Sequence, residues 1–179
     1  MPTLNGFLHF FFIIVRRSSI LTVSMVTHVV ILGYGEMGKA LHHVLKPQPN
    51  LTVTCWDKNS DILPHQSPLQ SILPSCDVLI ACVPTWTTRS VLQEIHPYLQ
   101  EKTIIVSVSK GFEKETCQRV DTLFPQHLPQ HNPFVFLGGP MISEELLNGL
   151  PATGVAASLN TTARNTVAML FRHTPLVVR

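Results

Sequence analysis

The chain has 179 residues, of which 45% are hydrophobic and 13% are charged, and its formal net charge is +2. This length suits one domain with a single core, and the abundance of Val, Ile, Leu and Phe excludes a disordered chain. The basic residues form no cluster, so we expect no nucleic-acid partner. The four cysteines have neither C-x-x-C nor zinc-ligand spacing, which favours a reduced chain in the cytoplasm without a metal site.

The first 24 residues differ from the rest of the chain. Residues 6–15 read GFLHFFFIIV and precede a pair of arginines. This apolar run is shorter than the roughly 20 residues that span a bilayer, and a secretory signal would carry its basic residues before the run. We interpret residues 1–24 as an extension from a misassigned start, with Met25 as the natural first residue of a single dinucleotide-binding domain over residues 25–179. The alternative is a membrane or targeting anchor.

From Thr27 onward the hydrophobic pattern predicts strands that alternate with helices. Strands are expected over residues 27–32, 51–56, 77–83, 103–109, 134–137, 155–158 and 175–179. Helices are expected over residues 36–46, 113–124 and 143–148, in one turn near 69–73, after Thr85 or Thr87, and after Asn160 or Thr161. The alternation predicts an α/β fold of the Rossmann type, with a doubly wound, mainly parallel sheet and helices on both faces.

The strongest motif is the loop GYGEMG, which directly follows the first predicted strand and opens the first predicted helix. In the G-x-G-x-x-G pattern, Gly33 permits a tight turn, Gly35 lets a pyrophosphate approach the backbone, and Gly38 lets the helix pack on the strand. Asp57 ends the second predicted strand, 19 residues after Gly38. A carboxylate there can accept hydrogen bonds from an adenosine ribose. The pattern therefore predicts a dinucleotide cofactor.

Three residues bear on how that cofactor binds. Asp57 favours NAD, because its carboxylate bonds the 2′-hydroxyl and repels a 2′-phosphate. Lys58 is an alternative partner for that phosphate and would favour NADP. We predict NAD or NADP as the cofactor, with a preference for NAD. Glu36, inside the glycine loop, is expected to point to solvent, away from the phosphate charge.

Two more segments follow predicted strands. The segment SVSKGFE places Lys110 at the carboxyl end of a parallel strand, where ligands bind in open α/β sheets. A lysine there can hold a phosphate or a carboxylate, although a solvated lysine at a strand end is the alternative. Residues 138–140 (GGP) also follow a strand, and their backbone N–H groups can face an anion, or they form only a turn.

Five segments come in a recognisable order: GYGEMG at 33–38, WDK at 56–58, DVLIACVP at 77–84, SVSKGFE at 107–113 and GGPMISEELLNGLP at 138–151. Together they closely resemble the N-terminal domain of bacterial-type, NAD(P)-dependent glycerol-3-phosphate dehydrogenase. The last two segments are the specific ones, because the glycine loop alone would equally suit prephenate or 6-phosphogluconate dehydrogenases. The resemblance runs from about Val26 to the last residue.

The resemblance implies roles for individual residues. Glu36 and Met37 occupy loop positions whose backbone touches the dinucleotide. Lys110 matches a lysine that lies between cofactor and substrate. Gly139 matches a glycine that contacts the substrate, and Ser143 matches a small residue close to the nicotinamide.

The resemblance also implies an oxidoreductase that interconverts dihydroxyacetone phosphate and sn-glycerol 3-phosphate, a reaction of glycerophospholipid metabolism. In that family the catalytic lysine and an arginine for the substrate phosphate lie in a second, helical domain. We therefore expect the present chain to be an inactive fragment without a catalytic residue, with an exposed domain face that allows self-association. The alternatives are a non-catalytic dinucleotide-binding module and a dehydrogenase of the prephenate or 6-phosphogluconate type.

Overall fold

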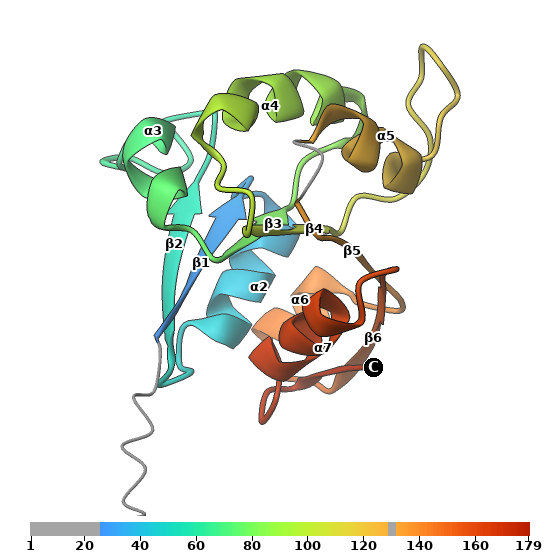
Figure 1. Ribbon diagram of the computed structural model, residues 1–179. Coiled ribbons are helices and arrows are strands. Elements are labelled where there is room, and N and C mark those ends of the chain that lie inside the picture. Colours follow the sequence, from blue (N-terminus) through green and yellow to red (C-terminus); the bar gives the residue numbers. More distant parts are fainter. Residues whose placement is uncertain (1–25, 129–131) are drawn as a thin grey trace, which may run out of the picture.

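The computed structural model describes residues 26–128 and 132–179. The predicted extension over residues 1–24 and the proposed first residue, Met25, lie outside the described residues. Within the described part the predicted alternation of strands and helices is confirmed (Figure 1).

Seven strands are present among the described residues, and all belong to one sheet. They are β1 (Thr27–Leu32), β2 (Leu51–Trp56), β3 (Val78–Ala81), β4 (Ile104–Ser107), β5 (Phe134–Gly138), β6 (Ala152–Ala157) and β7 (Leu176–Val178). Their order in the sheet is β2-β1-β3-β4-β5-β6-β7. Strands β1 to β5 are parallel, β6 runs antiparallel to β5, and β7 is parallel to β6. The predicted Rossmann-type, mainly parallel sheet is therefore confirmed.

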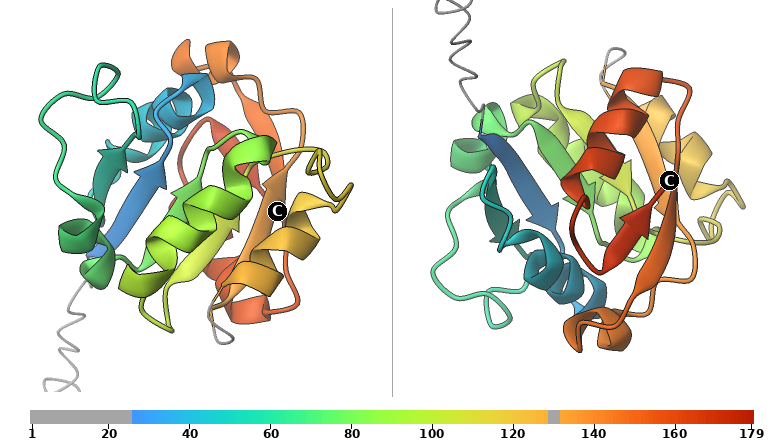
Figure 2. Two further views of the ribbon diagram at one scale, coloured as in Figure 1. Left: turned by 90° about the horizontal axis from the view of Figure 1, so that it is seen from above. Right: turned by 90° about the horizontal axis from the view of Figure 1, so that it is seen from below.

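Helices cover both faces of this sheet (Figures 1 and 2). They are α2 (Glu36–Leu45), α3 (Leu69–Ile72), α4 (Thr88–Ile95), α5 (Val120–His127), α6 (Ser143–Leu147) and α7 (Thr161–Leu170). Three short 3-10 turns accompany them: η1 (Leu73–Ser75), η2 (Thr85–Thr87) and η3 (His96–Tyr98). Among the residues that the model describes, no helix is both long enough and apolar enough to cross a membrane.

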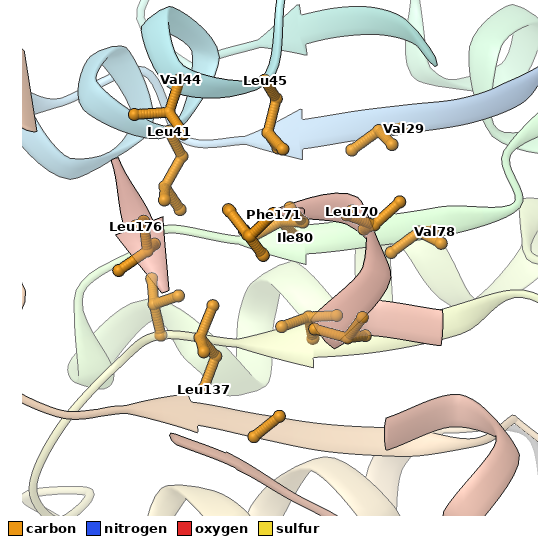
Figure 3. Close-up of a cluster of buried hydrophobic side chains, with 14 of the residues drawn as sticks. Val29, Leu41, Val44, Leu45, Val78, Ile80, Leu137, Leu170, Phe171 and Leu176 are labelled. Atoms are coloured by element: carbon orange, nitrogen blue, oxygen red, sulfur yellow. The ribbon is translucent and has the colours of Figure 1, made fainter. Parts of the chain in front are cut away.

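Two apolar cores hold the layers together, one on each side of the sheet. One joins the sheet to α2, α6 and α7, and the other joins it to α3, α4 and α5. Figure 3 shows the first core, where Leu41 of α2, Ile80 of β3 and Phe171 after α7 gather between the layers. Each fully buried side chain of this kind stabilises the fold by about 1.5–3 kcal/mol. The cores fix the positions of the strand ends, and those ends carry the polar motifs.

Two predicted elements begin three or more residues away from the observed start. The helix predicted from residue 113 begins at Val120, because the backbone N–H of Glu113 donates to the carbonyl of Gln118 and closes a turn instead. The strand predicted over 155–158 begins at Ala152, because that residue already pairs with β7. Neither the local turn nor the pairing with β7 leaves a periodic signal in the sequence.

Candidate dinucleotide site

The sheet has a topological switch point between β1 and β3. From β1 the chain passes to β2 on one side, and it then returns to form β3 on the other side. In open α/β sheets this divergence opens a crevice at the carboxyl ends of the strands. A cavity of about 640 Å³ lies there, and it is lined by residues that follow four different strands. They include Gly33, Gly35, Asp57, Cys82, Ser109 and Lys110.

The glycine loop lies at the floor of this cavity, and its packing requires glycine at two positions. Gly33 has φ +95°, and a Cβ there would lie 2.6 Å from the carbonyl oxygen of Cys82. A Cβ on Gly38 would lie 2.0 Å from the carbonyl oxygen of Gly33. The predicted roles of a tight turn and a close helix–strand contact therefore agree with the geometry.

Gly35 is different, because a Cβ there would meet nothing within 4 Å. It is the N-cap of α2 and makes no side-chain capping bond. The first N–H groups of a helix have no partner within the helix, and they carry its positive dipole end. The open space at Gly35 therefore suits an anionic group such as a pyrophosphate.

Asp57 lines the same cavity and holds the glycine loop in place. Its Oδ2 accepts a hydrogen bond from the backbone N–H of Tyr34 (2.6 Å), and its Oδ1 accepts one from Asn59 (2.8 Å). Gln66 bonds both the backbone N–H and the carbonyl of Asp57. Because an ionised carboxylate offers about four acceptor positions, Asp57 can hold the loop and still accept from a ribose.

Lys110 and Gly139, which are 29 residues apart in the sequence, lie side by side. Lys110 Nζ donates to the carbonyl oxygen of Gly139 at 3.2 Å. The carbonyl of Lys110 accepts from Thr85 Oγ1 at 2.7 Å, and Ser109 Oγ donates to the carbonyl of Val83 at 2.6 Å. These bonds tie the end of β4 to the segment after β3, so Lys110 stands at the rim of the cavity with its amine exposed.

The other predicted site residues differ in whether they line the cavity. Met37 lines the cavity and Lys58 is an exposed residue of its wall. Glu36 is exposed and does not line the cavity, in agreement with the expectation that it points to solvent. Ser143 begins α6 and is not part of the cavity wall.

One contact next to the glycine loop, between Tyr34 and His42, was not predicted from the sequence. The hydroxyl of Tyr34 lies 2.7 Å from His42 Nδ1, within hydrogen-bond distance, so the ring folds back onto α2. Burial lowers the pKa of His42, and the nearby Lys46 lowers it further. Burial also raises the pKa of the Tyr34 hydroxyl. The sequence spacing does not predict this pair, because Tyr34 lies before α2 and helical periodicity does not apply to it.

The cavity has the chemistry of a binding site. Its thiol, Cys82, is held protonated because burial raises its pKa, and a protonated thiol is a poor nucleophile. The charged groups in its wall are Asp57, Lys58 and Lys110, placed on opposite sides of the glycine loop. Such an arrangement can hold a ligand that has both hydroxyl and phosphate groups.

Comparison with known proteins gives the family. Residues 61–164, more than half of the chain, match the family described as the N-terminus of NAD-dependent glycerol-3-phosphate dehydrogenase. The chain belongs to this family. The matched stretch begins after the glycine loop at residues 33–38. The family match therefore does not depend on the G-x-G-x-x-G motif.

Curated relatives extend the match over most of the chain. A glycerol-3-phosphate dehydrogenase [NAD(P)+] of Clostridium acetobutylicum is 32% identical over 152 residues, which cover 73% of this chain and 45% of the relative. One of Synechocystis is 32% identical over 144 residues, which cover 80% of this chain and 43% of the relative. The chain thus spans about half the length of the curated relatives it matches.

Solved structures share the fold. The glycerol-3-phosphate dehydrogenase of Coxiella burnetii superimposes with a TM-score of 0.75 at 22% identity, over 85% of this chain and 53% of that one. A pyrroline carboxylate reductase of Plasmodium falciparum superimposes with a TM-score of 0.67 at 20% identity, over 87% of this chain and 57% of that one. These likenesses establish the architecture alone.

Proposed function

We propose that the chain is the dinucleotide-binding part of a glycerol-3-phosphate dehydrogenase and binds NAD(P)H in the cavity at the switch point. One observation carries the proposal: the glycine loop leaves open space at Gly35, directly before the N-terminus of α2. That space suits the pyrophosphate, with Asp57 on the ribose side. Gly33, Gly38 and Met37 shape the loop, and Glu36 contributes only its backbone.

For the substrate, we propose dihydroxyacetone phosphate in one direction and sn-glycerol 3-phosphate in the other. Lys110 would attract the phosphate or the carbonyl oxygen as a fixed positive charge, and the backbone at Gly139 would contact the substrate. Ser143 would approach the nicotinamide end. A bound nicotinamide would supply the hydride to the ketone, or accept it in the reverse direction, and the protein would orient the two reacting carbons.

We further propose that NAD is preferred over NADP. The cavity wall at the ribose end presents the carboxylate of Asp57, which would repel a 2′-phosphate. Lys58 is exposed beside it and favours the opposite choice, but as a solvated point charge it is screened more strongly.

The proposed compartment is the cytoplasm, because all four cysteines are free thiols and a reducing environment preserves them. Small molecules are the proposed partners, with neither nucleic acid nor membrane. Self-association is proposed for the polypeptide on its own, since large apolar side chains are exposed in β6 (Val155) and just after it (Leu159).

Gly35→Val tests the proposed function. The backbone at Gly35 has an ordinary φ of −69° and a Cβ meets nothing, so the variant should fold as the parent does. Its side chain would fill the pyrophosphate space, and we expect the affinity for NADH to fall by at least about 100-fold, a loss of about 2.7 kcal/mol. Calorimetric titration with NADH measures it.

His43→Val is the control, because it adds the same side chain on the exposed side of α2. It should bind NADH as the parent does. Equal NADH affinity in the parent and in Gly35→Val would disprove the proposed site.

A further inference from the structure

An ion pair between a buried carboxylate and a partly exposed guanidinium anchors the segment that carries Lys110. We call residues 108–119, between β4 and α5, the Lys110 loop. Glu113 in this loop is only 4% exposed. Its Oε1 accepts from Arg89 Nε and its Oε2 accepts from Arg89 Nη2, both at 2.8 Å. Two parallel bonds of this kind fix the orientation of the partners as well as their separation.

The pair joins three parts of the molecule. Arg89 lies in the first turn of α4, and its Nη1 donates to His127 Nε2, in the last residue of α5, at 2.7 Å. The hydroxyl of Thr116 donates to Oε2 of Glu113 from within the loop itself. Both oxygens of the buried Glu113 carboxylate thus accept hydrogen bonds within the protein, whereas the Arg89 side chain remains partly exposed.

The two residues just after Lys110 are exposed. Gly111 has φ +99°, and a Cβ there would meet nothing within 4 Å. Phe112 is 64% exposed. Before Lys110 the chain is held by Ser109, and after it the next buried side chain is Glu113. The course of the chain at Lys110 therefore depends on the bond from Thr85 to the Lys110 carbonyl and on the anchor at Glu113.

The other end of the pair belongs to the wall of the cavity. Thr87, Ser90 and Val91 line the cavity from the start of α4, and Arg89 lies between them in the sequence. The ion pair consequently connects the wall of the dinucleotide site with the lysine at its rim.

We propose that Arg89 and Glu113 are positioning residues that hold Lys110 beside Gly139, at the rim of the cavity. The proposal rests on the proposed function in that Lys110 is taken as the residue that meets the substrate. Neither Arg89 nor Glu113 touches the cavity, so both act through the loop.

The test measures the position of Lys110 through the reactivity of its amine in the complete chain. The rate of acetylation of Lys110 is compared, by mass spectrometry, with those of the exposed Lys39 and Lys102 in the same sample. In Glu113→Gln and in Arg89→Met we expect the Lys110 rate to rise about two- to tenfold relative to these references, the factor that corresponds to one lost hydrogen bond. The double variant should add nothing further, because either single change already removes the pair.

Two controls separate positioning from general loosening. Asp121→Asn removes the carboxylate of a neighbouring, exposed pair with Arg119, and it should leave the Lys110 rate unchanged. Arg89→Lys keeps the positive charge but loses the two parallel hydrogen bonds to Glu113. Its Lys110 acetylation rate should lie between those of the parent and Arg89→Met, and this comparison remains valid even if the Glu113 variant folds poorly.

The proposal is overturned if the Lys110 rate is unchanged in both single variants, or if all lysines become more reactive together. NADH titration of the same samples keeps the proposed function separate. If the parent fails to bind NADH while the Lys110 rate responds, the proposed function fails and the positioning stands. If the parent binds NADH while the Lys110 rate does not respond, only the positioning fails.

Discussion

At the scale of single residues, Asp57 performs two tasks with one carboxylate. Its two oxygens hold the backbone of the glycine loop and of the following turn, and the same carboxylate lines the cavity. Asp57 therefore has a structural role in the glycine loop in addition to the charge that it brings to the cavity. Because Asp57 also holds Tyr34, its replacement changes the loop for every cofactor, so only a ratio of affinities isolates its effect on the 2′ position.

Asp57→Ser should therefore shift the balance between the cofactors. The loss of a charged hydrogen-bond acceptor weakens NADH binding, and the loss of repulsion favours a 2′-phosphate. We expect the ratio of NADPH affinity to NADH affinity to rise by about tenfold, corresponding to about 1.4 kcal/mol. Titrations of both cofactors against parent and variant give the ratio.

Asp61→Ser is the matched control, since it removes an exposed carboxylate from the next turn without changing the cavity wall. Its ratio should equal the parent's. An unchanged ratio in Asp57→Ser would mean that the carboxylate does not face the ribose.

At the scale of elements, the Lys110 loop is stabilised by charge. Arg89 and then Thr116 donate hydrogen bonds to the carboxylate of Glu113, and these lower its pKa from 4.5 to about 2. The unfolded chain therefore takes up this proton at a higher pH than the folded chain does. The stability that the pair contributes is present above about pH 4.5 and is lost as the pH falls toward 2.

Unfolding by urea between pH 6 and pH 2 should reveal this window. The groups that face Glu113 are Arg89 from α4, Thr116 from its own loop and His127 from α5. At pH 6 the parent should be more stable than Glu113→Gln, and the difference should vanish toward pH 2. The side chain of Arg89 is 37% exposed, so solvent screening limits the size of the difference. A difference that stays constant over the whole range would rule out this origin.

At the scale of the whole molecule, the chain provides the cavity and the positive charge of Lys110. It spans about half the length of its curated relatives. In the proposed function, the group that donates the proton is expected in the part of the relatives that this chain does not cover. General acid catalysis contributes roughly 10²–10⁴-fold to a rate. We expect the 179-residue polypeptide alone to oxidise NADH with saturating dihydroxyacetone phosphate at least about 100-fold more slowly than the 10 per second typical of enzymes.

Absorbance at 340 nm follows this reaction, and Gly35→Val gives the background in the same assay. Turnover on the order of 10 per second by the polypeptide alone would contradict the expectation. Such a result would mean that residues 1–179 already contain the general acid for the reaction.

The sequence by itself determined the elements next to the glycine loop. The first two strands were predicted to their terminal residues, because β-branched runs end at Gly33 and Asp57, where turns are obligatory. Gly33, Gly35, Asp57 and Lys110 were also placed at strand ends, and the parallel sheet brings such ends to one edge.

Only the tertiary structure decided which of these strand ends meet and what holds them. Lys110 lies beside Gly139 because β4 and β5 are neighbours, and the reversed direction of β6 could not be inferred from alternation. Arg89 and Glu113 are 24 residues apart, with no motif that links them. Hydrophobic periodicity indicates which side chains are buried. Contacts of this kind form only when separate elements pack, so periodicity does not predict them.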